Sequence, residues 1–338
     1  MSRTAVVILN YNGRDWLRKF LPSVIRFSPE ARIVVADNSS TDDSVEMVSR
    51  EFETVEIIRI PTNKGYCGGY NFALRQVHAE YFVLLNSDVL VTQNWLKPII
   101  QLFEEHPTLG AAQPKILSYH KQNEFEYAGA SGGFIDTLGY PFCRGRIFNH
   151  LEKDEGQYND TCPVFWATGA CLFIRAELFH TIGGLDEDFF AHMEEIDMCW
   201  RLHRAGFDVY YQAQSQVYHV GGGTLSAANP KKTYYNFKNG LSLIFKNMST
   251  GQLLWKFPLR LMLDWIAATR FLIGGSAANS WAVLKAHIDF FAGLGKELKK
   301  RRELKQKFPF TDKGIYRGSV VVDFYLLGRK TFSKLGIQ

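Results

Sequence analysis

The pattern with the clearest chemical meaning in this 338-residue sequence is an apolar run that ends abruptly in Asn86, Ser87 and Asp88. Residues 81–85 are aromatic or aliphatic without polar alternation, which predicts a strand buried on both faces of a parallel sheet. Ligands of open α/β sheets bind beyond the carboxyl ends of the strands, so Asp88 is placed to meet a ligand through a divalent cation. The alternative is that the three polar residues only cap the following helix.

A second candidate is the acidic stretch 186–197, which holds six carboxylates in twelve residues. Acidic residues at the start of a helix interact favourably with its dipole, and apolar residues at helical spacing give this segment a buried face. The dipole accounts for only some of the acids, because carboxylates repel one another unless a cation or a protonated substrate group lies near. For Asp197, an ion pair with Arg201 one helical turn further on is an equally good explanation.

Two glycine-rich loops could supply further ligand contacts. His219 ends a predicted strand, 216–219, and precedes a run of glycines, although a lone histidine is ordinarily a structural residue. The loop 63–71 opens a predicted helix whose amino terminus could receive phosphate or ribose, and the alternative for this loop is a simple turn. Neither a G-x-G-x-x-G fingerprint after the first strand nor a P-loop is present, which disfavours a nicotinamide-binding domain.

The elements that must position these residues alternate along the first part of the chain. Apolar segments at 4–9, 31–36, 54–60 and 81–85 each end in a polar loop, and most loops lead into a helical pattern. This alternation predicts an α/β fold with a doubly wound, mostly parallel sheet and helices on both faces. A further strand is predicted to stop at Pro114, and the residues that follow lack a clear period, as in a substrate-binding excursion.

Composition excludes several classes of protein. Hydrophobic residues at 46% and charged residues at 22% are typical of a globular chain. The five cysteines include no C-x-x-C pair, which argues against a disulfide framework and a structural zinc site and suits a reducing cytoplasm. The apolar run 5–9 is too short for a signal peptide, so we expect no export by that route.

The last third of the sequence carries a different charge from the rest. Residues 241–338 hold 17 lysines and arginines against 6 acidic residues, whereas residues 1–240 are net negative. The apolar segment 253–273 contains four charged residues and Pro258, so we expect it to lie on a membrane as an amphipathic helix, near the basic tract 296–302, and not to span it. The alternative is packing against the rest of the protein or a second subunit. No recognised nucleic-acid motif accompanies the charge, so nucleic acid is not an expected partner.

Seven short motifs, in order along the chain, resemble glycosyltransferase family 2, the inverting nucleotide-sugar transferases of GT-A fold, and especially its bacterial rhamnosyltransferase-like branch. The motifs are Val7 to Asn12, Val35 to Asp42, Asn63 to Asn71, Leu85 to Asp88, Gly183 to Glu187, Glu194 to Asp197, and His219 to Gly222. The resemblance implies a GT-A nucleotide-sugar transferase domain at residues 1–245. Residues 246–338 would then form a helical, basic, membrane-associating region.

The resemblance also implies a nucleotide site. Tyr11 and Asp37 would lie against the nucleotide base, and Asn86 would lie near the ribose. The loop and helix start after the third strand would contribute further nucleotide contacts, from Lys64, Gly65 and Asn71.

A divalent cation, Mg²⁺ or Mn²⁺, is implied as the cofactor, with Asp88 and His219 as its protein ligands. Asn86 replaces the first aspartate of the family's D-x-D motif, so metal affinity without the sugar nucleotide should be weak. By the same resemblance Glu195 would be the catalytic base, with Asp197 as the second choice. An inverting transfer needs one carboxylate to accept the proton of the acceptor hydroxyl as its oxygen attacks the anomeric carbon.

The implied reaction moves a sugar from a nucleoside diphosphate, with dTDP-rhamnose favoured, to a hydroxyl of a cell-envelope glycan or polyprenyl-linked glycan at the inner face of the cytoplasmic membrane. One alternative is a nucleotidyltransferase, whose usual glycine-rich basic loop after the first strand is replaced here by Asn10-Tyr11-Asn12-Gly13. The other is a non-catalytic membrane-associated scaffold, and the joint presence of Asp88, Glu195 and His219 argues against it.

Overall fold

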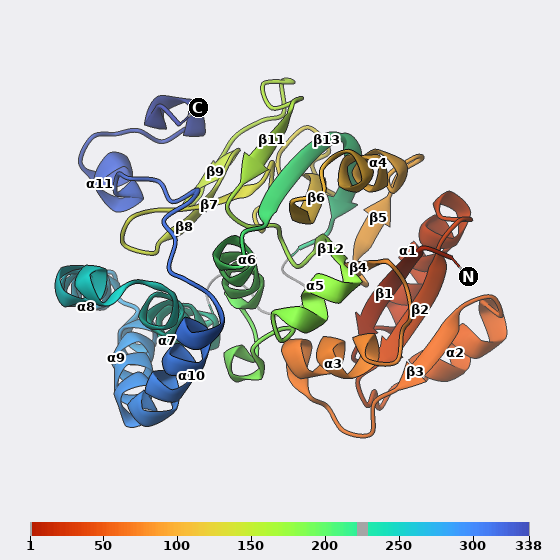
Figure 1. Ribbon diagram of the computed structural model, residues 1–338, viewed down its shortest axis with the longest axis horizontal. Helices are drawn as coiled ribbons and strands as arrows, with labels where there is room; N and C mark the ends of the chain where they lie inside the picture. Colours follow the sequence, from red (N-terminus) through yellow and green to blue (C-terminus); the bar gives the residue numbers. More distant parts are fainter. Residues whose placement is uncertain (1, 222–228, 338) are drawn as a thin grey trace.

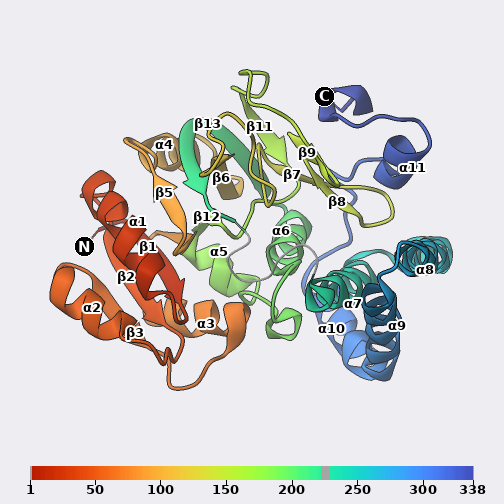
Figure 2. The same cartoon turned by 180° about the vertical axis from the view of Figure 1, so that it is seen from behind.

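The computed structural model describes residues 2–221 and 229–337, and it shows a nine-stranded central sheet with helices on both faces (Figure 1). The strand order is β11-β13-β6-β12-β4-β1-β2-β3, and β5 pairs with the end of β13. A second, four-stranded antiparallel sheet has the order β10-β9-β8-β7. The carboxyl-terminal helices lie at the side of the molecule away from β3, as the reverse view also shows (Figure 2).

The amino-terminal part of the sheet is parallel, with β1 between β2 and β4 and β3 paired with β2. Helices connect these strands in the predicted alternation. The elements are β1 (Thr4–Asn10), α1 (Arg14–Phe27), β2 (Arg32–Asp37), α2 (Ser44–Glu51), β3 (Glu56–Arg59), α3 (Gly65–Leu74) and β4 (Tyr81–Asn86). The predicted βαβ organisation is therefore confirmed.

The second part of the sheet is mixed, because β12 runs antiparallel to both of its neighbours, β4 and β6. Strands β6 and β13 are parallel to each other. The elements are β5 (Val89–Val91), α4 (Lys97–Glu105), β6 (Leu109–Ser118), β11 (Thr161–Val164), β12 (Cys171–Arg175), α5 (Ala176–Thr181), η1 (Glu187–Phe189), α6 (Glu194–Arg204) and β13 (Asp208–His219).

Alternate residues of the buried strands face opposite layers. On β1, Val6 and Ile8 belong to the apolar cluster that includes α1, α2 and α4, whereas Ala5 and Val7 belong to the cluster that includes α3, α5 and α6. This two-sided burial explains the continuous apolar runs of the sequence, because a strand covered on both faces has no polar side. The predicted doubly wound α/β architecture with helices on both faces is confirmed.

Strand β6 is longer than predicted, and the prediction that it stops at Pro114 is wrong. The strand continues to Ser118 because Pro114 lies at an irregularity of the ladder, where Gln212 of β13 pairs with Pro114 and Gln216 pairs with Lys115. Proline is tolerated at such a bulge because its missing N–H removes no regular ladder bond. The predicted strand 216–219 is the carboxyl-terminal end of the long strand β13.

The irregular segment after β6 contains the small sheet, which the sequence did not reveal because its strands are two or three residues long. The strands are β7 (Gly133–Ile135), β8 (Pro141–Cys143), β9 (Arg146–Ile147) and β10 (His150–Leu151). The carboxyl-terminal segment packs against this sheet. Tyr316 N donates to Ile135 O at 2.9 Å, and Val320 N donates to Asp136 Oδ2 at 3.0 Å.

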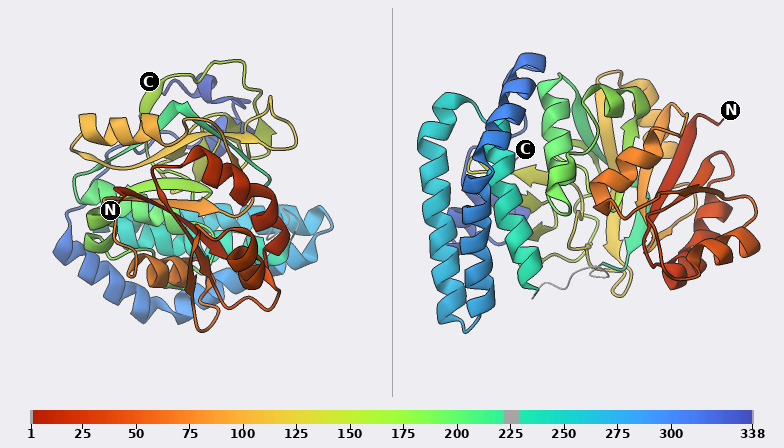
Figure 3. Two further views of the ribbon diagram at one scale, coloured as in Figure 1. Left: turned by 90° about the vertical axis from the view of Figure 1, so that its right-hand side faces the viewer. Right: turned by 90° about the horizontal axis from the view of Figure 1, so that it is seen from below.

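The carboxyl-terminal third is helical, as predicted, and α8 is its outermost helix (Figure 3). The elements are α7 (Pro230–Asn247), α8 (Thr250–Ile273), α9 (Ala277–Ala292), α10 (Leu294–Lys307), α11 (Val320–Tyr325) and η2 (Phe332–Leu335). The boundary predicted after residue 245 falls inside α7. Among the helices of residues 2–221 and 229–337, none is both long and apolar enough to cross a membrane.

A buried ion-pair network joins the carboxyl-terminal helices to the small sheet. Arg260 Nε lies 2.8 Å from Asp264 Oδ1, and the guanidinium lies 3.8 Å from the centre of the Tyr140 ring. Tyr140 Oη donates to Asp264 Oδ1 at 3.1 Å, and His287 Nε2 lies 3.3 Å from Asp264 Oδ2. The inward face of α8 is therefore polar, with His287 buried and Tyr140 partly buried against it.

We expect Arg260→Met to lower the free energy of unfolding by about 3–5 kcal/mol, because it leaves the Asp264 carboxylate buried without its principal counterion. Urea denaturation followed by circular dichroism measures the change. The matched control is Lys285→Met, which removes an i,i+4 pair of the same spacing from the exposed surface of α9. That variant should lose less than about 1 kcal/mol, and equal losses in the two variants would contradict the interpretation.

Candidate active site

The carboxyl ends of β4 and β13 meet at one edge of the sheet through the short strand β5. Val89 of β5 pairs with His219 of β13, so Asp88, the residue before β5, lies beside a histidine that is distant in sequence. His219 Nε2 is 3.2 Å from Asp88 Oδ1 and 3.5 Å from Asn86 Nδ2. The structure therefore brings together the two predicted metal ligands and the predicted ribose contact.

Glu126 is a second acidic residue of this cluster, and the sequence motifs did not indicate it. Its Oε2 lies 3.4 Å from His219 Nδ1 and accepts a hydrogen bond from Ala128 N at 2.6 Å. The segment is held against β6, because Glu126 N donates to Ile116 O at 3.0 Å. No periodic pattern marks residue 126, so only the tertiary contact with His219 identifies it.

The charges of the cluster determine the protonation of the histidine. Burial alone would lower the pKa of His219, but the carboxylates of Glu126 and Asp88 outweigh it and raise that pKa to about 10. Burial alone would raise the pKa of Asp88, and the contact with His219 holds that pKa below its ordinary value. The two carboxylates thus favour a positive charge between them.

The donor set fits a hard divalent cation that a phosphorylated ligand helps to bind. Asp88 offers carboxylate oxygens and His219 an imidazole nitrogen, a combination that Mn²⁺ tolerates better than Mg²⁺. Within the described ranges, no group of three or more His, Cys, Asp or Glu side chains is arranged to hold a metal ion by itself. Two protein ligands completed by phosphate oxygens and water fit that finding.

The predicted base contacts, Tyr11 and Asp37, lie at the ends of the neighbouring strands β1 and β2. Asn10 joins these ends, because its Nδ2 donates to Asp37 Oδ1 at 3.2 Å and to Ser44 Oγ at 2.9 Å. Asp37 is buried, whereas Tyr11 is 52% exposed and can stack against a ligand. Because β1 also pairs in parallel with β4, these residues lie at the same edge of the sheet as Asn86.

The other predicted nucleotide contacts lie at the start of α3 and within it. Gly65 has a φ of +67°, a conformation that side chains disfavour, and Lys64 is exposed. Asn71 is buried: its Nδ2 donates to Leu185 O and Glu187 Oε1, and its Oδ1 accepts from Leu185 N. Asn71 therefore braces the loop before α6, and a nucleotide contact for it stays a prediction.

The acidic helix start is α6, and the turn that precedes it has an unusual backbone. Phe190, His192 and Met193 all have positive φ angles, of 51°, 69° and 72°. Asn239 of α7 holds this turn, because its Nδ2 lies 2.8–2.9 Å from the carbonyl oxygens of Phe189, Ala191 and His192. Backbone conformations of this kind persist where the surrounding contacts over-determine them.

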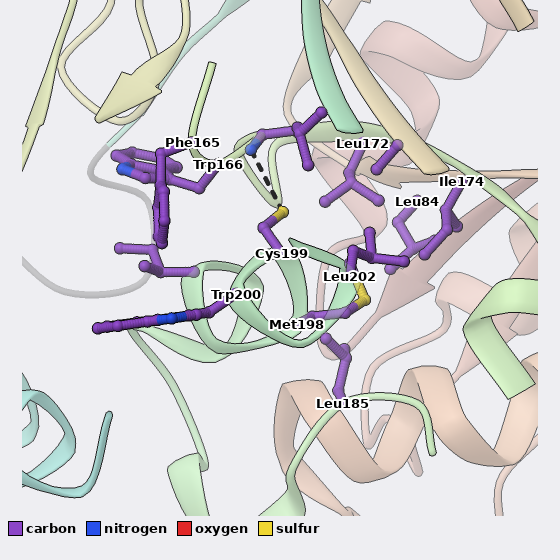
Figure 4. Close-up of a cluster of buried hydrophobic side chains, with 14 of the residues drawn as sticks. Leu84, Phe165, Trp166, Leu172, Ile174, Leu185, Met198, Cys199, Trp200 and Leu202 are labelled. Atoms are coloured by element: carbon purple, nitrogen blue, oxygen red, sulfur yellow. Dashed lines mark hydrogen bonds between the residues drawn. The ribbon is translucent and has the colours of Figure 1, made fainter. Parts of the chain in front are cut away.

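The apolar face of α6 anchors the helix to the sheet. Met198, Cys199 and Leu202 belong to a buried cluster with Leu84 of β4 and Leu172 of β12 (Figure 4). The thiol of Cys199 also lies 3.5 Å from Ala167 N. The position of the carboxylates at the amino end of α6 is therefore fixed relative to the strand ends.

Among the described residues, neither Glu194 nor Glu195 has a basic partner. The Oε2 atom of each is enclosed and forms no hydrogen bond with a described residue. Burial raises the pKa of Glu195 to about 7, against the opposing effect of backbone N–H groups that include Gly169. Burial and repulsion from Glu195 also raise the pKa of Glu194. The next residue, Ala170, accepts a hydrogen bond from Asn86 N at 3.0 Å, which links the surroundings of Glu195 to the end of β4.

Basic side chains neutralise other acids of the stretch. Asp197 is fully buried and pairs with Arg201 Nε and Lys246 Nζ, both at 2.8 Å. Asp186 pairs with Lys246 at 2.7 Å and with Lys300 at 2.5 Å. The predicted ion pair between Asp197 and Arg201 is therefore confirmed. Lysines of α7 and α10 also reduce the repulsion among these carboxylates, a role that the sequence had suggested for a bound cation or a protonated substrate group.

Residues 5–183 match the family model described as Glycosyl transferase family 2. Among curated proteins, the chain is similar to the N-acetylglucosaminyl-diphospho-decaprenol L-rhamnosyltransferase of Mycobacterium tuberculosis, with 25% identity over 78% of this chain and 90% of that protein. It is also similar to the low-salt glycan biosynthesis hexosyltransferase Agl10 of Haloferax volcanii, with 25% identity over 61% of this chain and 63% of that protein.

Solved glycosyltransferases share the fold. GalNAc-T7 with UDP, GalNAc and Mn²⁺ gives a TM-score of 0.57 at 15% identity, over 92% of this chain and 58% of that one. The mannosyltransferase PcManGT of Pyrobaculum calidifontis, with GDP-Man and Mn²⁺, gives 0.53 at 14% identity, over 90% and 85% of the two chains. The predicted GT-A fold is confirmed.

The family motifs and the geometry agree with each other. Two of the segments that carry the resemblance, 85–88 and 219–222, supply Asn86, Asp88 and His219, which meet in the structure, and a third supplies Glu195 at the start of α6. The prediction of a glycosyltransferase is confirmed over the nucleotidyltransferase and scaffold alternatives. Because the family model covers more than half of its length, the chain belongs to glycosyl transferase family 2.

Proposed function

We propose that this glycosyltransferase moves a sugar from a nucleoside diphosphate, with dTDP-rhamnose as the favoured donor, to a hydroxyl of a lipid-linked cell-envelope glycan. The observation that carries the proposal is the contact between Asp88 and His219 at the sheet edge that also holds Tyr11 and Asp37. A nucleotide at Tyr11 and Asp37 would place its diphosphate towards Asp88, beyond the carboxyl ends of the strands.

Asp88 and His219 would hold Mg²⁺ or Mn²⁺ together with the donor diphosphate. When bound, the cation supplies positive charge that stabilises the departing diphosphate. The chain itself orients the two ligands, because the β5–β13 pairing fixes His219 beside Asp88 and Glu126 contacts the other ring nitrogen. Such outer contacts set the orientation of a ligating imidazole.

Glu195 would act as the base of a single inverting displacement. Its enclosed Oε2 has no hydrogen-bond partner among the described residues, so it is free to accept the proton of an acceptor hydroxyl. Its pKa of about 7 is close to that of an efficient general base at neutral pH. Asp197 lacks this freedom, because Arg201, Lys246 and Asn247 occupy its oxygens.

The donor and acceptor are proposed from the relatives. The Mycobacterium tuberculosis protein is named as a rhamnosyltransferase that acts on a decaprenol diphosphate-linked sugar, and it is similar over most of its own length. A lipid-linked acceptor resides at a bilayer, so the enzyme that uses it benefits from a membrane-binding surface. We accordingly propose a peripheral location at the inner face of the cytoplasmic membrane.

The outward face of α8 supports this location because the helix is polar on the inside and apolar on the outside. Lys256, Arg260 and Asp264 are buried, with 6%, 3% and 0% of their surface exposed. The opposite face exposes several large apolar side chains, among them Trp255, Met262, Trp265, Ile266, Leu272 and Ile273. An exposed patch of this size marks an interaction surface, and tryptophans are typical of helices that lie in the membrane interface.

Helix α11 extends the same surface. It lies on the same side of the molecule as α8 (Figures 1 and 2), and the Arg270 guanidinium lies 4.8 Å from the centre of the Tyr325 ring. Leu326 and Leu327 are exposed and are followed by the exposed basic residues Arg329 and Lys330. Apolar side chains next to basic ones fit a bilayer with anionic headgroups, where each Lys or Arg contributes about 1 kcal/mol.

We expect Asp88→Asn to abolish Mn²⁺-dependent binding of dTDP together with turnover, because the cation loses its carboxylate ligand. Glu195→Gln should keep dTDP binding and lose about 10²–10⁴-fold in kcat, the usual contribution of general base catalysis. Titration calorimetry and release of nucleoside diphosphate from dTDP-rhamnose measure the two effects. Glu105→Gln, at an exposed position of α4, is the matched control, and normal turnover in Asp88→Asn would contradict the proposal.

The raised pKa of Glu195 predicts how activity depends on pH. Below pH 7 the carboxyl is protonated and cannot accept a proton, so kcat/KM should rise with pH through a midpoint of about 7. The initial rate measured with subsaturating donor and acceptor across this range tests the expectation. A profile that is flat from about pH 5.5 to pH 8 would exclude Glu195, with this pKa, as the base.

Membrane binding is tested by co-sedimentation with vesicles of phosphatidylglycerol and phosphatidylcholine. We expect the wild-type chain to bind anionic vesicles and the double variant Trp265→Ser, Leu326→Ser to bind at least about tenfold more weakly, because two large apolar side chains no longer enter the interface. Leu151→Ser, an exposed leucine of β10, is the control. Absence of wild-type binding, or equal binding by the double variant, would refute the assignment of this face.

A further inference from the structure

Arg146 of β9 is a buried cation that forms no ion pair with a carboxylate in the part of the chain that the structure describes. The residue is only 8% exposed. Its Nη1 donates to Phe148 O at 3.1 Å, its Nη2 lies 3.3 Å from Cys143 Sγ, and its Nε has no hydrogen-bond partner among the described residues. A carbonyl and a thiol do not neutralise a guanidinium, and a buried charge without a counterion is unfavourable.

Tyr127 brings a second cation to the same place. The Arg146 guanidinium carbon lies 4.4 Å from the centre of the Tyr127 ring, and Lys232 Nζ lies 5.5 Å from it. Lys232 is in the first turn of α7, where the helix dipole adds positive potential. Tyr127 is 44% exposed, so a ligand can reach this cluster from solvent.

Glu126 acts on both cations but is already engaged elsewhere. Its Oε2 faces His219 and accepts the hydrogen bond from Ala128 N. Burial lowers the pKa of Lys232, Glu126 opposes that change, and Arg146 lowers the pKa further. Asp88 and Glu126 both contact His219, and among the described residues neither carboxylate forms an ion pair with Arg146 or Lys232, so these two cations keep their positive charge.

From these contacts we infer that Arg146, Lys232 and Tyr127 form a binding site for a phosphate or diphosphate group of a substrate. Guanidinium and ammonium groups are well suited to phosphate oxygens, and neither Arg146 nor Lys232 forms an ion pair with a carboxylate of the described residues that a phosphate would have to displace. Glu126 connects the cluster to His219, so the bound phosphate would lie beside the proposed metal site. The inference rests on the proposed function for the identity of the substrate, which is either the donor diphosphate or the diphosphate that carries the acceptor glycan.

Titration calorimetry of the 338-residue chain with inorganic pyrophosphate, in metal-free buffer, tests the site. Arg146→Met and Lys232→Met should each weaken pyrophosphate binding about tenfold, the loss expected for one charge-assisted hydrogen bond. Lys231→Met, at the exposed neighbouring position, should change the affinity by less than about twofold. Wild-type affinity in either Arg146→Met or Lys232→Met would overturn the two-cation site.

The same variants identify the source of the phosphate. If dTDP binding in the presence of Mg²⁺ weakens together with pyrophosphate binding, the site holds the donor diphosphate. If dTDP binding is unchanged and binding of farnesyl diphosphate weakens, the site holds the diphosphate of a lipid-linked acceptor. Loss of pyrophosphate binding alone would mean that only an adventitious ion binds there, and it would overturn the substrate role.

Two controls accompany these variants. Arg146→Lys keeps the charge and should retain most of the pyrophosphate affinity, and thermal unfolding shows whether each variant folds. If Arg146→Met does not fold, Lys232→Met, at a half-buried position, tests the site instead. A wild-type chain that fails to bind dTDP with Mg²⁺ contradicts the proposed function. Normal dTDP binding with unchanged pyrophosphate binding in the variants contradicts this inference alone.

Discussion

The pairing of β5 with the end of β13 is the interaction on which the site depends. Only three residues of β5 take part, yet their register places His219 directly beside Asp88, and Glu126 closes the other side of the imidazole. Two buried carboxylates next to each other would repel, and the histidine between them removes that repulsion in the chain alone. In the proposed function, Asp88 and His219 would then need little reorganisation to hold a cation, because the strand pairing already places them side by side.

The carboxyl-terminal helices hold the acidic stretch 186–197 in place although they contain none of the family motifs. Lys246 and Lys300 neutralise Asp186, Lys246 also neutralises Asp197, and Asn239 holds the strained turn before α6. These contacts neutralise Asp186 and Asp197, whereas Glu195 has no basic partner among the described residues. Burial therefore raises the pKa of Glu195 to about 7, because no cation of the described residues compensates for it.

Helix α8 of the same region has one face towards the protein and one towards the outside. Arg260 and Asp264 form an ion pair on the inward face, where Tyr140 and His287 also contact Asp264, so these charged residues of the helix lie inside the protein. The outward face is then left with tryptophan, leucine and isoleucine side chains. Contact with water is unfavourable for such a face, and in the proposed function a bilayer covers it.

The sequence alone was sufficient for the order of strands and helices up to Asp88 and for the family, because both depend on local periodicity and on short motifs at fixed places along the chain. It could not reveal the extension of β6 beyond Pro114, the role of Glu126 or the cation cluster at Arg146, since each depends on a partner that is remote in sequence. It also left Asp197 undecided between catalysis and an ion pair. The folded chain distinguishes the two acids, because it places Arg201 and Lys246 against Asp197 and, within residues 2–221 and 229–337, no basic side chain against Glu195. Burial and neighbouring charge are properties of three-dimensional packing, so the sequence could not make this distinction.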